Sequence, residues 1–116
     1  MAIIREMDAI NKNVMSDPTV RDASIKVLIG PEEGWDSHVM RGVEIGEEGY
    51  SPLHNHPWPH INYIIEGEGI LMINGKENPI KKGTVACIPP GETHQFKNTG
   101  KEKLVLICIV PKEGHQ

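Results

Sequence analysis

The chain has 116 residues, the length of one ordinary domain. Lys and Arg number 12 against 16 Asp and Glu, a formal charge of −4 without a basic stripe, which argues against nucleic-acid binding. Two cysteines, Cys87 and Cys108, cannot form a disulfide framework. Because no apolar run reaches membrane-spanning length and the start lacks a signal-peptide layout, we expect a cytoplasmic protein without membrane contact.

Residues 1–23 are expected to form an N-terminal arm, and residues 24–116 one β-domain. Apolar residues at helical spacing occur in the arm before Asp17-Pro18 interrupts the pattern: Ile3, Met7, Ile10 and Val14. This is too much apolar surface for a free tail in a small protein. The arm is therefore expected to pack on the barrel exterior or on a neighbouring subunit.

Short strands separated by turn residues are predicted after the arm, and no convincing helix. Their ranges are 24–29, 39–45, 53–56, 60–65, 70–73, 84–88, 93–97 and 104–110. Asn74-Gly75 between two extended runs indicates a hairpin. Strand 104–110 is apolar on both faces, so it needs a cover on each side. The pattern favours an all-β sandwich or barrel.

Four of the six histidines lie between positions 54 and 94. On a strand, His54 and His56 would point to one face. His60 follows a Pro-Trp-Pro loop that can return a neighbouring strand, and His94 follows a Pro-Pro-Gly turn. Imidazole is the commonest protein metal ligand, so this set predicts a divalent transition-metal site. Pairs of this kind also occur on exposed strand faces, which is the alternative.

The frame around these histidines resembles the two motifs of the cupin family. The residues similar to the first motif are Gly49, His54, His56, His60 and Gly67, with Gly49 one residue closer to the first histidine than usual. The second motif, Gly-x5-Pro-x-Gly-x2-His-x3-Asn, is matched at every spacing by Gly83, Pro89, Gly91, His94 and Asn98. The resemblance implies a single-domain, all-β jelly-roll barrel.

The resemblance also implies the metal ligands: His54, His56, His60 and His94, one metal per chain. The family's usual fourth ligand is Glu, and here position 60 is His. Four neutral ligands leave the full charge on the ion, which raises its Lewis acidity and puts mechanisms copied from glutamate-containing cupins in doubt. We rank Mn first, then Fe, with Ni, Zn or Cu as alternatives.

Strand parity extends the site into a substrate pocket. With His94 and His60 pointing inward, Phe96 and Asn62 do so too. Asn62 would bind a ligand, orient an imidazole or satisfy backbone groups. By resemblance to small four-histidine cupins, the pocket also includes Arg41, Leu106 and Cys108.

Arg41 is expected to pair with a substrate carboxylate or to lie at the rim. Cys108 is either a soft residue near the metal or a small buried hydrophobe. Cys87 is expected in the core, Trp58 at the pocket mouth or a dimer interface. His38 and His115 are expected to take no part. No catalytic residue beyond the metal ligands is identified.

Three functions stay open at this point, because fold does not give function. The first is a small Mn- or Fe-dependent oxidoreductase, dioxygenase-like, acting on a small organic substrate. The second is a metal-assisted isomerase, lyase or decarboxylase, which needs a base near the pocket. The third is a non-catalytic small-ligand-binding module. A homodimer is expected, with the N-terminal arm in its interface.

Overall fold

Nine strands make up most of the chain in the computed structural model, which describes residues 2–115. They are β1 (Asn13–Val14), β2 (Arg21–Ile29), β3 (His38–Tyr50), β4 (His60–Glu66), β5 (Glu68–Ile73), β6 (Lys76–Lys81), β7 (Val85–Ile88), β8 (His94–Asn98) and β9 (Leu104–Pro111). The helices are single 3-10 turns at Met7–Ala9, Pro31–Glu33 and Lys112–Gly114. The all-β prediction is confirmed.

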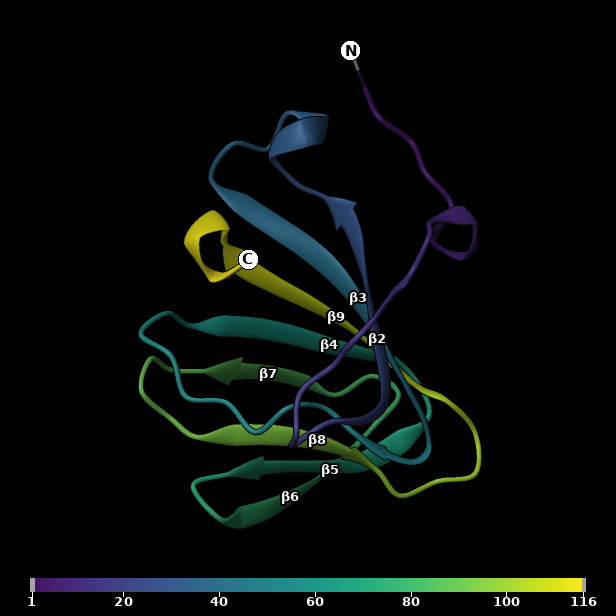
Figure 1. The fold of residues 1–116 in the computed structure, drawn as a ribbon, viewed down its shortest axis with the longest axis vertical. Helices are drawn as coiled ribbons and strands as arrows, with labels where there is room; N and C mark the ends of the chain where they lie inside the picture. The colour runs from purple at the N-terminus through teal and green to yellow at the C-terminus, as the bar shows by residue number, and fades with distance from the viewer. Residues whose placement is uncertain (1, 116) are drawn as a thin grey trace.

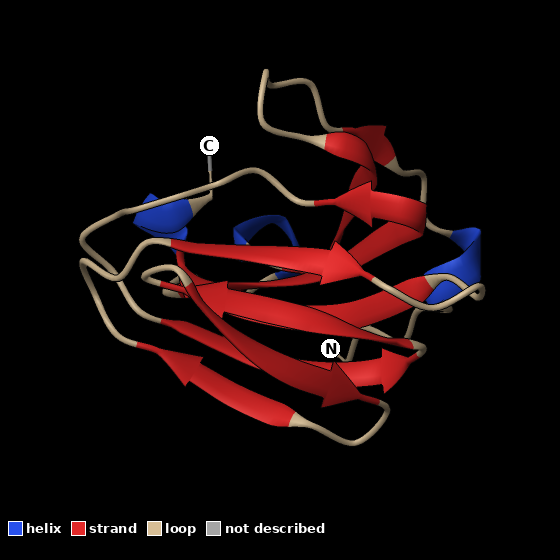
Figure 2. Cartoon of the chain, turned by 90° about the horizontal axis from the view of Figure 1, so that it is seen from below, coloured by secondary structure: helices blue, strands red, loops and turns tan. Residues whose placement is uncertain are grey.

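The strands pair antiparallel in the order β6-β5-β8-β3-β9-β4-β7, with β2 on β3 and β1 on β2. The long strand β3 pairs with β9 along most of its length and reaches β8 only at Tyr50. It therefore links a sheet of β2, β3, β9, β4 and β7 to a sheet of β8, β5 and β6, and the two curl around one core (Figure 1, Figure 2). This is the predicted jelly-roll barrel.

The hairpin predicted at Asn74-Gly75 joins β5 to β6, with Ile73 paired to Lys76. Both turn residues have positive φ, 50° for Asn74 and 82° for Gly75, as a type I′ turn requires. Asparagine and glycine tolerate this conformation better than other residues, which is why the pair predicts the turn.

Side chains that alternate along the strands fill the space between the two sheets. Ile45 and Leu104 are completely buried, and Ile64, Leu106 and Phe96 pack with them. On β4, residues 60, 62 and 64 point inward and residues 61 and 63 outward. The polar residues His60 and Asn62 thus occupy positions that a core would normally fill with apolar groups.

The placement of Cys87 in the core is wrong, because this cysteine is exposed. Strand β7 pairs only with β4 among the described strands, and Cys87 lies opposite the outward-facing Ile61. All four residues of β7 are apolar or small, so the sequence carries no alternation that would assign its two faces.

The N-terminal segment folds back onto its own barrel, one of the two arrangements that the sequence left open. Val14 pairs with Ser24 of β2. Lys26, a buried lysine of β2, donates to the Met7 carbonyl at 3.0 Å and pairs with Glu44 at 3.1 Å. A Cβ at position 42 would clash with the Met7 side chain, so Gly42 permits this close packing.

No helix within residues 2–115 has the length and apolar character needed to cross a membrane. The cytoplasmic location stays a prediction.

Candidate metal centre

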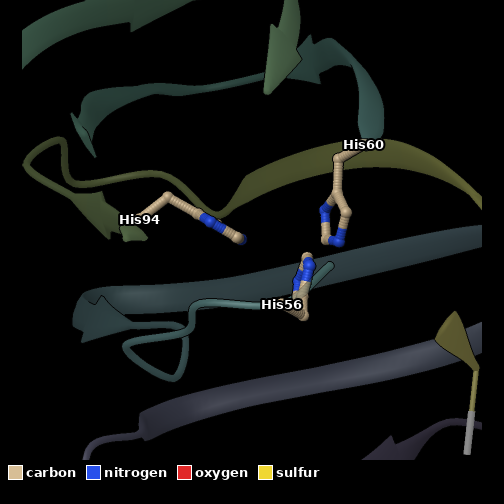
Figure 3. Close-up of side chains that lie close together, drawn as sticks. All are labelled: His56, His60 and His94. Carbon is tan, nitrogen blue, oxygen red and sulfur yellow. The ribbon is translucent and has the colours of Figure 1, made fainter. Parts of the chain in front are cut away.

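Three histidines, His56, His60 and His94, gather at one end of the barrel interior (Figure 3). One ligand nitrogen from each lies within 4.8 Å of the others. The ring centroids are 4.4 Å apart for His56 and His60, and 5.0 Å from His94 to each of the other two. Three donor atoms at this separation can converge on one transition-metal ion.

Different elements supply the three imidazoles. His60 and His94 are the first residues of β4 and β8, and both are buried. His56 comes from the loop before β4, where the Trp58 ring stacks on it at 4.9 Å between centroids. The prolines on either side of Trp58 prevent regular strand pairing and leave His56 free to turn inward.

Hydrogen bonds to Nδ1 orient the rings. The Nδ1 of His94 donates to the Glu92 carbonyl at 2.9 Å, and that of His56 to the Trp58 carbonyl at 3.3 Å. Because a carbonyl only accepts, these bonds place the proton on Nδ1 and leave the Nε2 lone pair free. The Nδ1 of His60 faces the Cys108 sulfur at 3.4 Å, and its Nε2 is buried without a partner. The donor set therefore fits a divalent transition metal.

The surroundings keep the rings of His60 and His94 neutral. Burial, followed by the neighbouring His56 and His94, lowers the pKa of His60 to about 3. Burial also lowers the pKa of His94, opposed by its hydrogen bond to Glu92. A metal ligand must be deprotonated, so near neutral pH these imidazoles can bind a cation without first losing a proton.

His54 lies beside this cluster rather than in it. Its backbone bridges to His94 through two hydrogen bonds, of 3.0 and 2.8 Å. Its ring centroid is 5.7 Å from that of His56 and 6.0 Å from that of His94, and the residue is exposed. The structure thus gathers three of the four predicted ligands. His38 and His115 lie outside the cluster.

A cavity of about 330 Å³ opens next to the histidines. Its lining includes all five predicted pocket residues: Arg41, Asn62, Phe96, Leu106 and Cys108. His54, His60 and His94 line it too. Three of the four predicted metal ligands thus line the same cavity as the predicted pocket residues, whereas His56 lies outside its lining.

Arg41 and Cys108 touch inside the cavity. The Nη2 of Arg41 donates to the Cys108 sulfur at 3.2 Å. That sulfur also faces His60, so Cys108 is more than a buried hydrophobe. Trp58 is partly buried and packs against the core, and it lies outside the cavity lining.

The sequence did not identify several further lining residues: Met15, Asp17, Ile25, Val43 and Ser51. Val43 follows Arg41 by two residues on β3, so strand parity could have found it. Met15 and Asp17 belong to the N-terminal arm, whose path over the barrel no local pattern shows.

Comparison with known proteins gives one family assignment. The family model for the cupin domain matches residues 42–110. The oxalate-binding protein of Thermotoga maritima is 41% identical over 59 residues, which is 50% of this chain and 49% of that protein. The chain spans about half the length of the first curated relatives it matches.

Two solved structures have the same fold. A protein from Thermotoga maritima, described as a predicted oxalate decarboxylase, superposes with a TM-score of 0.84 at 25% identity, over 94% of this chain and 98% of that one. The polyketide cyclase RemF from Streptomyces resistomycificus superposes with a TM-score of 0.88 at 24% identity, over 96% of this chain and 80% of that one. The second likeness is evidence for the fold alone.

Proposed function

The chain belongs to the cupin family, and from that premise we propose that it is a small metal-dependent oxidoreductase of the dioxygenase type. One divalent transition metal is held by His56, His60 and His94, with His54 as the fourth ligand. A small organic substrate occupies the adjoining cavity. Mn is the first candidate ion and Fe the second.

The observation that carries this proposal is the combination of three converging imidazoles with a cavity that offers little acid–base chemistry apart from its histidines. Among the described lining residues, Asp17 is the single carboxylate, and it is exposed at the arm. Isomerases, lyases and decarboxylases that polarise a carbonyl need a positioned acid or base. A bound Mn or Fe ion would supply Lewis acidity and a redox couple without one.

The residues of the chain itself bind and shield the substrate. Arg41 provides a positive charge and Asn62 an amide within the cavity. Phe96 and Leu106, both buried, exclude water from the side away from the histidines. The Nδ1 bonds to Trp58, Glu92 and Cys108 hold the imidazoles in place.

A second candidate function is non-catalytic binding of a small organic acid. The oxalate-binding relative and the cationic Arg41 in the cavity support it. This alternative keeps the same metal and the same cavity, so only a measurement of substrate turnover distinguishes the binding protein from the oxidoreductase.

The deciding experiment is elemental analysis of protein purified without added metal, followed by oxygen-uptake assays with enol, catechol and alkene substrates. His94→Ala should lose both metal and uptake, whereas His38→Ala, outside the cluster, should keep both. Stoichiometric metal with no oxygen uptake for any substrate would favour the binding function. A metal-free protein that cannot be loaded would contradict both.

A further inference from the structure

The side chains facing the cavity from the larger sheet form layers of different chemistry. On β4 the inward residues are His60, Asn62 and Ile64, each two positions and therefore about 7 Å further along the strand. The cavity thus passes from an imidazole through an amide to an aliphatic side chain.

Neighbouring strands extend the middle layer. Cys108 of β9 pairs with Arg41 of β3 on one side and with Asn62 of β4 on the other. Cross-strand partners share a face, so these three polar side chains form one row across the sheet. The Cα atoms of Arg41 and Asn62, two strands apart, are separated by roughly 10 Å.

The next layer is apolar in the same register. Leu106 pairs with Val43 and with Ile64, and Val43 pairs with Ile25. Phe96, from the opposite sheet, lines the same cavity. A ligand that reaches this layer needs an apolar group to replace water favourably.

Three buried polar atoms of this row, on Arg41 and Asn62, have no hydrogen-bond partner among the described residues, and they specify a ligand. Asn62 is 2% exposed, and both its Nδ2 and its Oδ1 lack hydrogen-bond partners within the described part of the chain. The Nε of Arg41 is likewise buried and unpaired. Leaving such groups unsatisfied costs free energy, which a bound molecule with matching groups would recover.

Each unpaired group selects a different partner. The guanidinium donates only and is cationic, so it fits a carboxylate. The amide of Asn62 has both a donor and an acceptor free, and a hydroxyl can serve both at one atom. A single molecule that carries a carboxylate, a hydroxyl and an apolar group for the next layer would satisfy all of these side chains.

We infer that the cavity binds a hydroxy acid carrying an apolar substituent, an assignment that rests on the proposed function and names the class of ligand that its cavity recognises. The carboxylate pairs with Arg41 and the hydroxyl with Asn62. The substituent lies against Val43, Leu106 and Phe96. Oxalate, named for the relative, has neither the hydroxyl nor the substituent.

Isothermal titration calorimetry with four probes tests each group separately. The probes are 3-phenyllactate, which has all three groups, 3-phenylpropanoate without the hydroxyl, 3-phenylpropane-1,2-diol without the carboxylate, and lactate without the ring. On the metal-supplemented wild-type protein, 3-phenyllactate should bind tightest, and each deletion should weaken binding by about tenfold or more.

Two variants assign the groups to residues. Asn62→Leu should abolish the preference for 3-phenyllactate over 3-phenylpropanoate and keep the preference over the diol. Arg41→Met should abolish the preference for 3-phenyllactate over the diol and keep the preference over 3-phenylpropanoate. Arg21→Met removes the same charge from an exposed position outside the cavity lining and should change neither ratio.

Equal affinities across the wild-type panel, or no binding of any probe at millimolar concentration, would overturn the inference. Metal content of the same samples is measured in parallel. If the protein holds its full metal content but binds all four probes equally, the hydroxy-acid inference is wrong and the proposed function still stands. Failure to take up metal removes the proposed function, whatever the probes do.

Discussion

The sulfur of Cys108 lies 3.4 Å from Nδ1 of His60. The same sulfur accepts a hydrogen bond from Arg41 at 3.2 Å, so the thiol connects the guanidinium in the cavity to an imidazole of the candidate metal centre. The contact engages Nδ1 of the ring and leaves its buried Nε2 without a hydrogen-bond partner among the described residues. Partners of this kind fix the orientation of ligating histidines in metalloproteins.

Replacing Cys108 should therefore weaken metal binding without removing a ligand. Cys108→Val, which keeps the volume and loses the polar contact, should lower metal affinity by about tenfold. Cys108→Ser should retain most of the affinity, because its hydroxyl can still bond Nδ1. Chelator-competition titrations measure the effect. Cys87→Val, on the exposed face of β7, serves as the control, and an equal loss there would contradict the positioning role.

The fourth ligand is a separate prediction. If His54 joins the three clustered histidines on the metal, His54→Ala should reduce metal affinity by more than about 100-fold, beyond the loss expected for a residue that only orients a ligand. His56→Ala should cost more, because its ring lies closer to both partners. Metal affinity equal to wild type in His54→Ala would show a three-histidine site.

Stability should depend on pH through Glu44. Two lysines hold this carboxylate, Lys103 at 2.9 Å and the buried Lys26 at 3.1 Å. The hydrogen bond from Lys103 lowers the pKa of Glu44 most, burial opposes it, and Lys26 adds to the lowering. A carboxyl with a lower pKa in the folded chain stabilises it fully above the unfolded pKa, about 4.3, and loses that contribution as pH falls through the folded pKa.

Glu44→Gln should therefore cost about 1.5–3 kcal/mol of unfolding free energy at pH 7, and much less below pH 4. Urea denaturation at both pH values measures the difference. Glu77→Gln, at an exposed position of β6, is the control and should change little at either pH. A cost for Glu44→Gln that stays constant with pH would contradict this account.

Local patterns predicted the parts of the fold that depend on neighbouring residues. The turn at Asn74-Gly75 and the alternation of His60, Asn62 and Ile64 follow from short-range geometry. The alternation rule failed at Cys87, because all four residues of β7 are small or apolar and its two faces therefore have the same character in the sequence. It also left open whether the arm folds onto its own barrel, because that depends on distant contacts such as Lys26 with Met7.

The candidate site divides in the same way. Phe96 and Asn62 share strands with the histidines, so parity predicted that they face the cavity. The separation of His54 from the tight cluster was not predictable, because residues 51–59 do not form a regular strand. His54 makes an isolated bridge to His94 there, and contacts with distant residues set the path of the segment. Spacing identifies candidate ligands, and tertiary packing decides which nitrogens converge.

The homodimer stays a prediction, and an outward apolar surface suggests where to test it. Val85 is opposite Tyr63, and Ile61 is opposite Cys87, so these side chains share the outer face of β4 and β7. Ile61, Tyr63 and Val85 are 49%, 47% and 72% exposed. A second copy of the chain packed against this apolar face would remove it from water, which is favourable.

Multi-angle light scattering at tens of micromolar should therefore report a dimer for the full chain. The double variant Ile61→Lys, Val85→Lys should be a monomer with an unchanged circular-dichroism spectrum. Dimerisation through this face would bury two unpaired lysine charges from each copy, which costs free energy. Ile4→Lys makes the same change on the arm, where Ile4 is 91% exposed. If this substitution rather than the sheet-face pair breaks the dimer, the arm forms the interface. A monomeric wild-type chain at these concentrations would contradict the dimer altogether.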